Sequence, residues 1–553
     1  MSQPPDQRKP QRDASLSKLS IQNFKAFGEM VDVPIRPITL IFGENSSGKS
    51  SILHSLLFLN QMQYQPQEQL TDITYTKIGG NSVDLGGIPQ LLYKHSENNK
   101  LQFRIEVLCD IHKLTSTSLK NKIINLLEKF PHLKSLYTLT VVLTLSKDAA
   151  LEQVDYLIDN IPAYTLTNFK IDSGRMMSTN RSGSFNYIRL RSIIEGINKS
   201  IFPYLAQNSF FYEQLIGDNI YLQHETKELF DDFIKIINDK MNIPELIISL
   251  LFRNTIINSS TLLFERLNRH HNDFSVTFRA KTEPEKNQDK HTILHFMRRL
   301  LETVSGLQPF AQINNITYLG PIRTIPTRNF DTLDSINRDP STGSTAWDKL
   351  ANDDQLRASV NHWLDKFGTN KQITTEQLVD TAQLRKTVSE SVSTTQIEDI
   401  IKQLTTRNLL RFYDPQKDIH LSHRDLGVGI SQVLPVLVNS IANSDTTVLI
   451  EQPELHLHPR LQGDLADLFI DTAIKGEQQN TYIIETHSEA LILRLLRRVR
   501  EGVINPDDIA ILYVSPSEHG SMVKHIRVDA DGDFLDRWPN GFFEETYRDR
   551  MGF

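Results

Sequence analysis

Cysteine is almost missing from this chain, which carries one residue of that type, Cys109, among 553. A single cysteine excludes an internal disulfide framework and a zinc site built on cysteine ligands. Long hydrophobic runs are missing as well, because no apolar stretch reaches the length of a membrane-spanning helix. The polar residues 1–16 lack the apolar core of a secretory signal and are predicted to be a disordered leader. Together these absences predict a cytoplasmic protein without a membrane anchor.

An excess of positive charge is also missing, since 60 Lys and Arg residues stand against 67 Asp and Glu residues, for a net charge of −7. This balance argues against a surface dedicated to coating nucleic acid, although it leaves room for a local basic groove. An arginine-rich run between residues 494 and 500 is best interpreted as the solvated face of a helix. The length of the chain predicts two or three folding units.

Apolar periodicity divides the chain into two strand-rich ends and a helical middle. Residues 17–117 and 314–545 alternate short apolar runs with helical spacing, whereas residues 118–313 show mainly helical spacing and one expected strand at residues 137–145. We therefore predict the α/β class, with one head assembled from both ends of the chain. The helical insertion is expected to project as an arm, and residues 546–553 form a tail.

The stretch LIFGENSSGKSSIL, residues 40–53, contains the pattern G-x-x-x-x-G-K-[ST] between an apolar strand and a helix. In this pattern backbone N–H groups surround phosphate oxygens, the lysine reaches the β- and γ-phosphates, and the serine hydroxyl contacts Mg²⁺. The sequence therefore predicts that ATP and Mg²⁺ bind here. The predicted nucleotide-binding residues are Gly43, Glu44, Asn45, Ser46, Ser47, Gly48, Lys49, Ser50 and Ser51, with Ser50 on the metal.

Acidic and polar residues end two strands near the other end of the chain. The run TVLI, residues 447–450, is followed by Glu451, and the end of a strand in an α/β sheet is where ligands bind. Glu451 is therefore predicted to hold Mg²⁺. The run TYIIETHS ends in polar residues, of which His487 can contact the γ-phosphate. The run DLGVGISQVLPVL, residues 425–437, predicts a further phosphate-binding helix start near Ser431.

These motifs in this order resemble the ABC-type ATPases of the RecF, SMC and OLD group, in which helical arms are inserted into the ATPase head. The runs LSIQNFKAFGE, YLGPIR and WPNGFF are similar to bacterial AAA-family proteins of anti-phage defence, notably the PtuA family of Septu and retron-linked systems. The resemblance covers residues 17–110 and 314–545. It implies an ABC-type P-loop head that gates a separate effector nuclease.

The resemblance also implies partners and a composite site. Copies would pack head to tail as a dimer or a higher even-numbered oligomer. His487 would be the switch histidine, and LHLHP would be the loop that communicates between subunits. Further implied partners are an HNH-type, PtuB-like nuclease, a retron reverse transcriptase with its RNA or DNA, and other nucleic acid. The residues implied to act in trans on the nucleotide of the other copy are Gly427, Gly429, Ser431 and Gln432.

The pair Glu451 and Gln452 departs from transporter-type heads, which have Asp-Glu before the proline. An amide cannot accept a proton from the attacking water, so hydrolysis is expected to be slow unless Glu454 is the base. The candidate catalytic residues are thus Glu451, Gln452, Glu454 and His487. The coupling glutamine stays open among Gln61, Gln63 and Gln90.

Three other functions compete with this interpretation. A self-contained OLD-type nuclease would need a further catalytic domain, and only 65 residues follow Ser488. The run DADGD, residues 529–533, imitates a metal-binding D-x-D, but Asp-Gly favours a hairpin. A RecF-like or SMC-like repair ATPase and a transporter subunit are the remaining alternatives. The aromatic residues Trp538, Phe542 and Phe543 either dock an effector or pack the tail onto its own head.

Overall fold

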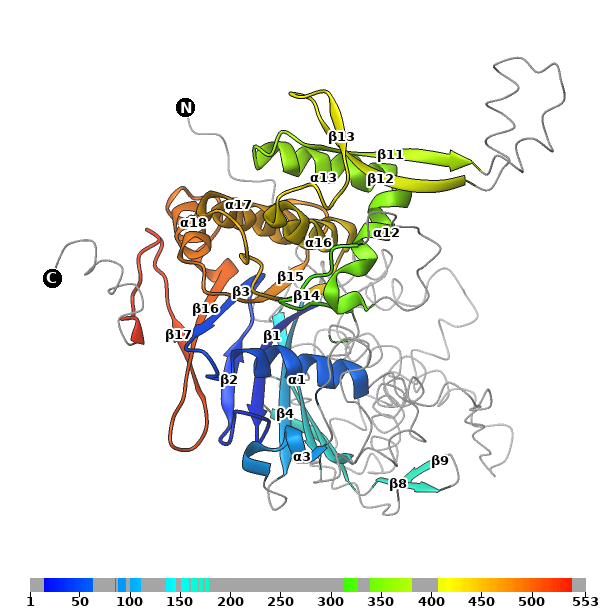
Figure 1. Ribbon diagram of the computed structural model, residues 1–553. Coiled ribbons are helices and arrows are strands. Elements are labelled where there is room, and N and C mark those ends of the chain that lie inside the picture. The colour runs from blue at the N-terminus through cyan, green and yellow to red at the C-terminus, as the bar shows by residue number, and fades with distance from the viewer. Residues whose placement is uncertain are drawn as a thin grey trace, which may run out of the picture. The chain divides into compact units, whose positions relative to one another are not determined.

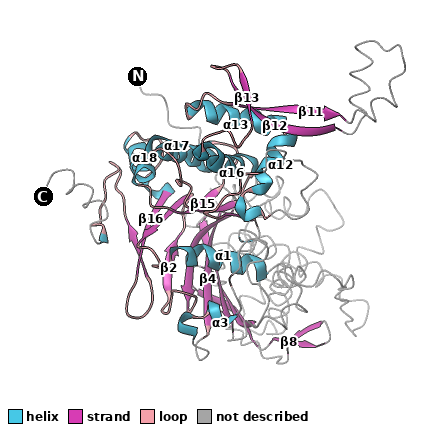
Figure 2. Cartoon of the chain, in the orientation of Figure 1, coloured by secondary structure: helices cyan, strands magenta, loops and turns pink. Residues whose placement is uncertain are grey.

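The computed structural model describes 14–62, 85, 88–95, 100–110, 136–145, 151–158, 161–167, 169–172, 175–178, 313, 315–326, 339–379 and 406–539 (Figures 1 and 2). The chain divides into two compact units. One comprises residues 1–23, 59–76 and 95–314, and the other comprises residues 24–58, 77–94 and 315–553.

The first unit contains an antiparallel sheet with the strand order β1-β4-β5-β6-β7. Alternate residues of β4 are fully buried, among them Phe103 and Ile105, while Gln102 and Arg104 between them are partly exposed. This period of two is what an antiparallel sheet with one buried face requires. Its strands are β1 (Ala14–Gln22), β4 (Leu101–Asp110), β5 (Leu136–Leu145), β6 (Leu151–Ile158) and β7 (Ile161–Thr167), and β8 (Phe169–Asp172) pairs with β9 (Arg175–Ser178).

Apart from residue 313, the described part of the insertion is therefore made of strands. The one strand that the sequence predicted there is β5, and β6 to β9 are strands that it missed. Their short runs mix polar with apolar residues, and such runs resemble loops unless the partner strand is known. The stretches with helical spacing are residues 119–136, 227–241 and 291–304. Apart from Leu136, the first residue of β5, they lie outside the described residues, so their helices stay a prediction.

The second unit is built on a sheet with the order β10-β14-β15-β3-β16-β17. The first five strands are parallel, and β17 is antiparallel to β16. Every residue of β3, β14 and β15 is buried, as the continuous apolar runs of strands covered on both faces demand. The strands are β3 (Ile38–Gly43), β10 (Ile316–Leu319), β14 (Thr447–Glu451), β15 (Thr481–Glu485), β16 (Ile509–Ser515) and β17 (Met522–Ile526).

Helices cover both faces of this sheet. Figure 1 shows α16, α17 and α18 side by side on one face, where Leu40, Ile450 and Ile484 join their apolar residues in one core. Alternate strand residues point to the opposite face, where α1 lies (Figure 1). The helices are α1 (Lys49–Met62), α16 (Val428–Ala442), α17 (Pro459–Ile470), which continues into the π-helical turn η4 (Asp471–Lys475), and α18 (Glu489–Arg500).

A smaller layer of α12, α13 and the sheet β11-β12-β13 packs on the same core, in which Trp347 of α12 is fully buried. Asp353 caps α13 by accepting the N–H of Leu356 at 2.9 Å. The remaining elements are β2 (Val31–Pro34), α3 (Ile88–Leu91), η1 (Tyr93–His95), η3 (Pro340–Thr342), α12 (Ser344–Asn352), α13 (Asp354–Lys366), β11 (Gln372–Val379), β12 (Thr406–Asp414), β13 (Ile419–Leu421) and η5 (Pro506–Asp508).

The α/β class and the assembly of the head from both ends of the chain are confirmed, because β3 lies between β15 and β16. The boundaries of the compact units differ from the predicted domain boundaries, since β1 and β4 belong to the first unit together with β5 to β7. Strand β1 also begins at Ala14, inside the predicted leader. None of the helices in the described ranges is long and apolar enough to span a bilayer.

Candidate functional site

The glycine-rich turn joins the end of β3 at Gly43 to the start of α1 at Lys49. Gly43 has φ of 148° and Gly48 has φ of 97°, in the region that favours glycine. A Cβ atom on Gly43 would overlap the carbonyl oxygen of Val514, and one on Gly48 would lie 2.5 Å from the Cβ of Ala26. Glycine is therefore required at both positions by conformation and by space.

Lys49 lies inside this turn, where its Nζ donates to the carbonyl oxygens of Gly43 at 3.1 Å and Glu44 at 2.8 Å. Burial lowers the pKa of this lysine, although the nearby Glu485 opposes that shift. The Oγ of Ser47 is buried without a hydrogen-bond partner among the described residues. Glu44, Asn45 and Ser46 are exposed at the tip, as a loop that receives a ligand requires.

The back of the turn is closed by a residue from the far end of the chain. Ser521, just before β17, donates its hydroxyl to the carbonyl oxygen of Ser47 at 2.6 Å, across 474 positions of sequence. Its backbone N–H donates to the carbonyl oxygen of Ala26 at 2.8 Å. The loop is thus held from behind by backbone groups and one hydroxyl.

Two carboxylates stand next to each other at the carboxyl edge of the sheet, because Glu451 ends β14 and Glu485 ends β15 in the same register. Tyr318 of β10 donates its hydroxyl to Oε1 of Glu451 at 2.9 Å. His54 of α1 places Nε2 3.6 Å from the same oxygen, and Lys25 lies 3.1 Å from the Nδ1 of that histidine. Burial, followed by the charge of Glu451, raises the pKa of Tyr318.

Glu485 is a site residue that the sequence analysis missed. Ser50 donates its Oγ to Oε2 of Glu485 at 2.6 Å, and the Nζ of Lys49 lies 4.0 Å from Oε1. Burial raises the pKa of Glu485, Ser50 and Lys49 lower it, and the charge of Glu451 raises it further. Its place directly before Thr486, at the end of an apolar run, is the signal that could have found it.

The predicted catalytic residues beyond β14 lie close together. Gln452 has a left-handed φ of 46°, and its N–H donates to the carbonyl oxygen of Glu485 at 2.7 Å. Glu454 is buried and its Oε1 accepts the N–H of His487 at 2.7 Å. Burial raises the pKa of Glu454 despite that hydrogen bond. Burial, then the charge of Lys49, lowers the pKa of His487, so its ring is neutral near pH 7.

Arg323, from the run YLGPIR, fixes the turn that carries these residues. Its Nη2 donates to the carbonyl oxygens of Glu451 at 2.8 Å and Gln452 at 3.2 Å. Burial lowers its pKa to about 10, against the charges of Glu454 and Glu451. No role was predicted for this arginine, because its contacts join the segment after β10 to the end of β14 across 128 positions.

The segment predicted to act in trans begins its helix earlier than expected and turns two of its four predicted residues inward. Helix α16 begins at Val428, so the expected start near Ser431 is wrong. With that start, position 431 faces inward: Ser431 donates its Oγ to the carbonyl oxygen of His423 at 3.0 Å, and Gln432 donates its Nε2 to that of Arg323 at 3.0 Å. Both side chains are buried in their own chain. The accessible part of the segment is Gly427 to Gly429.

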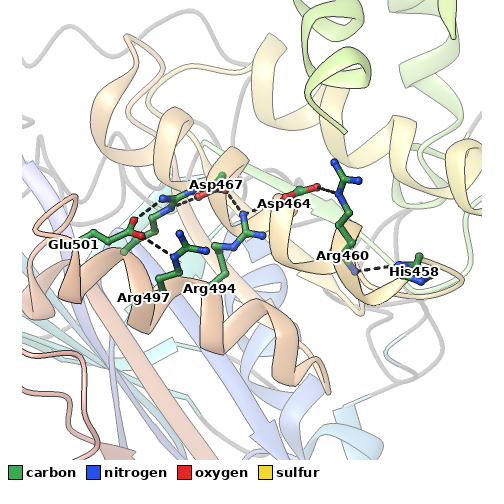
Figure 3. Close-up of polar contacts among 8 residues, drawn as sticks. His458, Arg460, Asp464, Asp467, Arg494, Arg497 and Glu501 are labelled. Carbon is green, nitrogen blue, oxygen red and sulfur yellow. Dashed lines mark hydrogen bonds and ion pairs between the residues drawn. The ribbon is translucent and has the colours of Figure 1, made fainter. Parts of the chain in front are cut away.

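The loop LHLHP, residues 455–459, directly follows Glu454. Gly429 packs against the carbonyl oxygen of His456, where an added Cβ would lie 2.7 Å away. His458 caps α17, since its Nδ1 accepts the N–H of Arg460 at 3.3 Å (Figure 3). No group of three or more His, Cys, Asp or Glu side chains suited to a metal occurs in the described ranges. Of the candidate coupling glutamines, Gln61 lies in α1, Gln90 lies in α3 and Gln63 is outside the described residues.

The arginine run of α18 is paired with carboxylates. Figure 3 shows Arg494 reaching Asp464 and Asp467 of α17. Arg498 binds Asp467 at 2.6 Å and 2.9 Å and Glu501 at 2.6 Å. Arg497 binds Glu501, and Arg500 binds Asp533. The pairs with Asp464 and Asp467 fasten α18 to α17. All four arginines of this run are therefore paired with carboxylates of the same chain.

We predict that Asp467→Asn lowers the free energy of unfolding by about 1–2 kcal/mol at pH 6, because it removes charge-assisted hydrogen bonds. Burial alone would raise the pKa of Asp467, but Arg498 and Arg494 outweigh it and hold the pKa below its ordinary value. The unfolded chain therefore binds the proton first as pH falls, and this stabilisation is lost below about pH 4.

Thermal unfolding of wild type and Asp467→Asn at pH 6 and pH 3.5 checks this expectation. The exposed Glu477→Gln is the matched control and should leave the melting temperature unchanged. A gap between wild type and Asp467→Asn that stays constant down to pH 3.5 would contradict the assigned ion pairs.

The D-x-D pattern forms a turn. The carboxylate of Asp529 accepts the N–H groups of Asp531 at 3.0 Å and Asp533 at 2.8 Å, and Val528 forms an antiparallel bridge with Phe534. Arg500 binds the outer side of the same turn. The hairpin interpretation of this segment is confirmed.

Of the three aromatic residues at 538, 542 and 543, Trp538 is described, and it packs on its own chain. The ring of Trp538 lies edge to face with those of Phe42 at 5.7 Å, Tyr513 at 6.1 Å and Phe534 at 5.4 Å. Phe542 and Phe543 lie outside the described residues. Trp538 is thus accounted for by packing within the chain.

Comparison with known proteins gives two family matches. A model described as an AAA ATPase domain matches residues 15–492, and one described as a protein of unknown function (DUF3696) matches residues 504–551. No curated protein matches the chain. Similar solved structures include an Smc head domain with an extended coiled coil bound to the C-terminal domain of ScpA, derived from Pyrococcus furiosus. It has 13% identity and a TM-score of 0.34, covering 93% of this chain and 96% of that chain. The SMC head domain from Thermotoga maritima has 10% identity and a TM-score of 0.34, with 93% and 99% covered.

Proposed function

Because the chain belongs to the AAA ATPase domain family, we propose that it binds ATP with Mg²⁺ through residues 43–51 and hydrolyses it slowly. One observation carries this proposal: the glycine turn meets Glu451 and Glu485 at the carboxyl edge of one parallel sheet. Ligands of open α/β sheets bind at this edge, and the start of a helix there favours phosphate.

The side chains at this edge fit a magnesium ion. Mg²⁺ takes oxygen ligands and is usually held by one or two carboxylates together with substrate phosphates. Ser50 and Glu451 would hold the ion, whose chemistry is to neutralise the charge of the phosphates. Lys49 would exchange the loop carbonyls for the β- and γ-phosphates. The neutral ring of His487 would hydrogen-bond to the γ-phosphate.

Slow hydrolysis is supported by Gln452. This residue directly follows the proposed metal ligand Glu451, at the position where a general base is expected, and its amide cannot accept a proton. Glu454 is the alternative base, and its raised pKa suits a proton acceptor. Its contact with the backbone of His487 joins the base and the phosphate sensor in one turn. Such a site favours a clamp that holds ATP for long periods over a fast motor.

A second copy of the chain would complete the site in a head-to-tail dimer. The support is the N-terminal end of α16, where Gly427 is exposed and Val428 is 54% exposed. The free N–H groups of a helix start are suited to phosphate oxygens. In this proposal the trans contacts come from Gly427 to Gly429, while Ser431 and Gln432 position that turn from inside.

We assign the ATPase to a cytoplasmic anti-phage complex in which ATP state decides whether a separate HNH-type nuclease is held or freed. The support is the resemblance of the motifs to Septu-type ATPases. A self-contained nuclease would need the D-x-D carboxylates to bind metal, but the carboxylate of Asp529 accepts backbone N–H groups of its own turn. This disfavours the OLD-type alternative.

Co-expression with an HNH-type nuclease, taken from a gene next to this one if such a gene is present, followed by size exclusion with and without ATP, tests the assignment. We expect one stable complex whose composition or nuclease activity changes with ATP. Wild type alone is the control and should leave DNA intact. Separate elution under both conditions, together with DNA cutting by this chain alone, would replace the regulator by a self-contained nuclease.

A further inference from the structure

We propose that Glu485 is a carboxylate ligand of the magnesium ion, paired with Ser50, so that the metal lies between the ends of β14 and β15. This inference rests on the proposed function and adds a residue to its site. The motif at residues 451–454 points to β14 alone, whereas the contacts of the P-loop serine point to the neighbouring strand.

The serine contact is the first support. The Oγ of Ser50 is the group that a P-loop presents to Mg²⁺, and it donates to Oε2 of Glu485 at 2.6 Å. A carboxylate within hydrogen-bond distance of the metal-binding hydroxyl is also within reach of the metal. Within the described part of the chain, the side-chain hydrogen bond of Ser50 goes to Glu485 and that of Glu451 comes from Tyr318.

The two carboxylates have different neighbours. Glu451 is held from one side, where Oε1 receives the hydroxyl of Tyr318 and faces Nε2 of His54. Glu485 is held from the P-loop side by Ser50 and lies 4.0 Å from Lys49. Glu451 is therefore anchored toward β10 and α1, and Glu485 is directed toward the phosphate loop.

Charge supports the same arrangement. Glu451 and Glu485 are paired in parallel register, so their side chains leave the sheet on one face. They are only 8% and 6% exposed. Two buried carboxylates side by side repel each other, and a divalent cation between them offsets this repulsion. The phosphates of ATP would draw Lys49 toward themselves, and the cation would replace that lysine as a counter-charge of Glu485.

The test compares wild type with Glu485→Gln, which keeps the shape of the side chain and removes its charge. ATP affinity is measured by calorimetry in EDTA and in Mg²⁺, and Mn²⁺ affinity of the ATP complex is measured by electron paramagnetic resonance. We expect Glu485→Gln to bind ATP normally in EDTA and to bind Mn²⁺ at least about 10- to 100-fold more weakly, because loss of an outer-shell partner alone has an effect of that size. The exposed Glu477→Gln should match wild type in both measurements.

Glu485→Asp is a second variant, which keeps the test decisive if Glu485→Gln does not fold. It keeps the carboxylate on a shorter side chain, so its Mn²⁺ affinity should lie between those of wild type and Glu485→Gln. Wild-type Mn²⁺ affinity in Glu485→Gln, or no loss in Glu485→Asp when the amide variant does not fold, would overturn the assignment while ATP binding stands. Failure of wild type to bind ATP in either buffer would overturn the proposed function itself.

Discussion

Lys49→Ala is expected to abolish measurable ATP binding, with affinity reduced by about 100-fold or more. The lysine supplies a point charge at the β- and γ-phosphates, and hydrogen bonds to charged groups contribute about 1.5–3 kcal/mol each. Two such bonds correspond to a change in affinity of at least that size. Calorimetry with ATP and Mg²⁺ measures the effect directly.

The fold should survive this substitution. Lys49 is 4% exposed, and burial lowers its pKa although Glu485 opposes that shift, so removing the charge also removes its desolvation cost. The exposed Lys475→Ala is a control that also removes one lysine and should bind ATP as wild type does. If Lys49→Ala binds ATP with unchanged affinity, the P-loop interpretation of residues 43–51 is wrong.

The second large effect concerns the general base. Removing a positioned base lowers turnover by about 10²- to 10⁴-fold, so Glu454→Gln should nearly eliminate ATP hydrolysis if Glu454 has that role. Gln452→Glu restores an acid next to Glu451 and should raise turnover above wild type if position 452 faces the attacking water. Single-turnover hydrolysis of both variants at pH 7 distinguishes the two positions.

Both variants should bind ATP as wild type does, and this separates loss of the base from loss of the site. Increased turnover in Gln452→Glu, with Glu454→Gln unaffected, would assign the base position to residue 452. Loss in Glu454→Gln, with no gain in Gln452→Glu, would assign it to Glu454. Wild-type rates in both variants would exclude the two residues from proton transfer.

The sequence predicted the parts of the site that local patterns encode. Gly43 and Gly48 are required by backbone conformation, and Glu451 follows an apolar run, so each can be recognised within a few residues of sequence. The edge at which they meet follows from the parallel order of the strands. Glu454 and His487 were predicted singly, and the structure joins them through one hydrogen bond.

The missed residues depend on contacts between distant strands. Tyr318 and Arg323 act through β14, more than 120 positions away, and Glu485 acquires its role from the register of β15 between β14 and β3. The predicted start of α16 is three residues late, because two glycines close together are typical of a loop. In the structure Gly427 has a φ of −58° and is the N-cap of the helix. Polar strands such as β6 give weak signals before their partners are known.

The place of β3 in the sheet has a consequence for synthesis of the protein. Both of its neighbours, β15 and β16, are translated more than 430 residues after it. Until then the apolar run of residues 38–42 emerges from the ribosome with two unpaired edges, which other chains can pair with. Ser521, which closes the back of the phosphate loop, arrives later still. The proposed nucleotide site is therefore among the last parts of the head to form, because its loop is closed from behind only after β16 has been made.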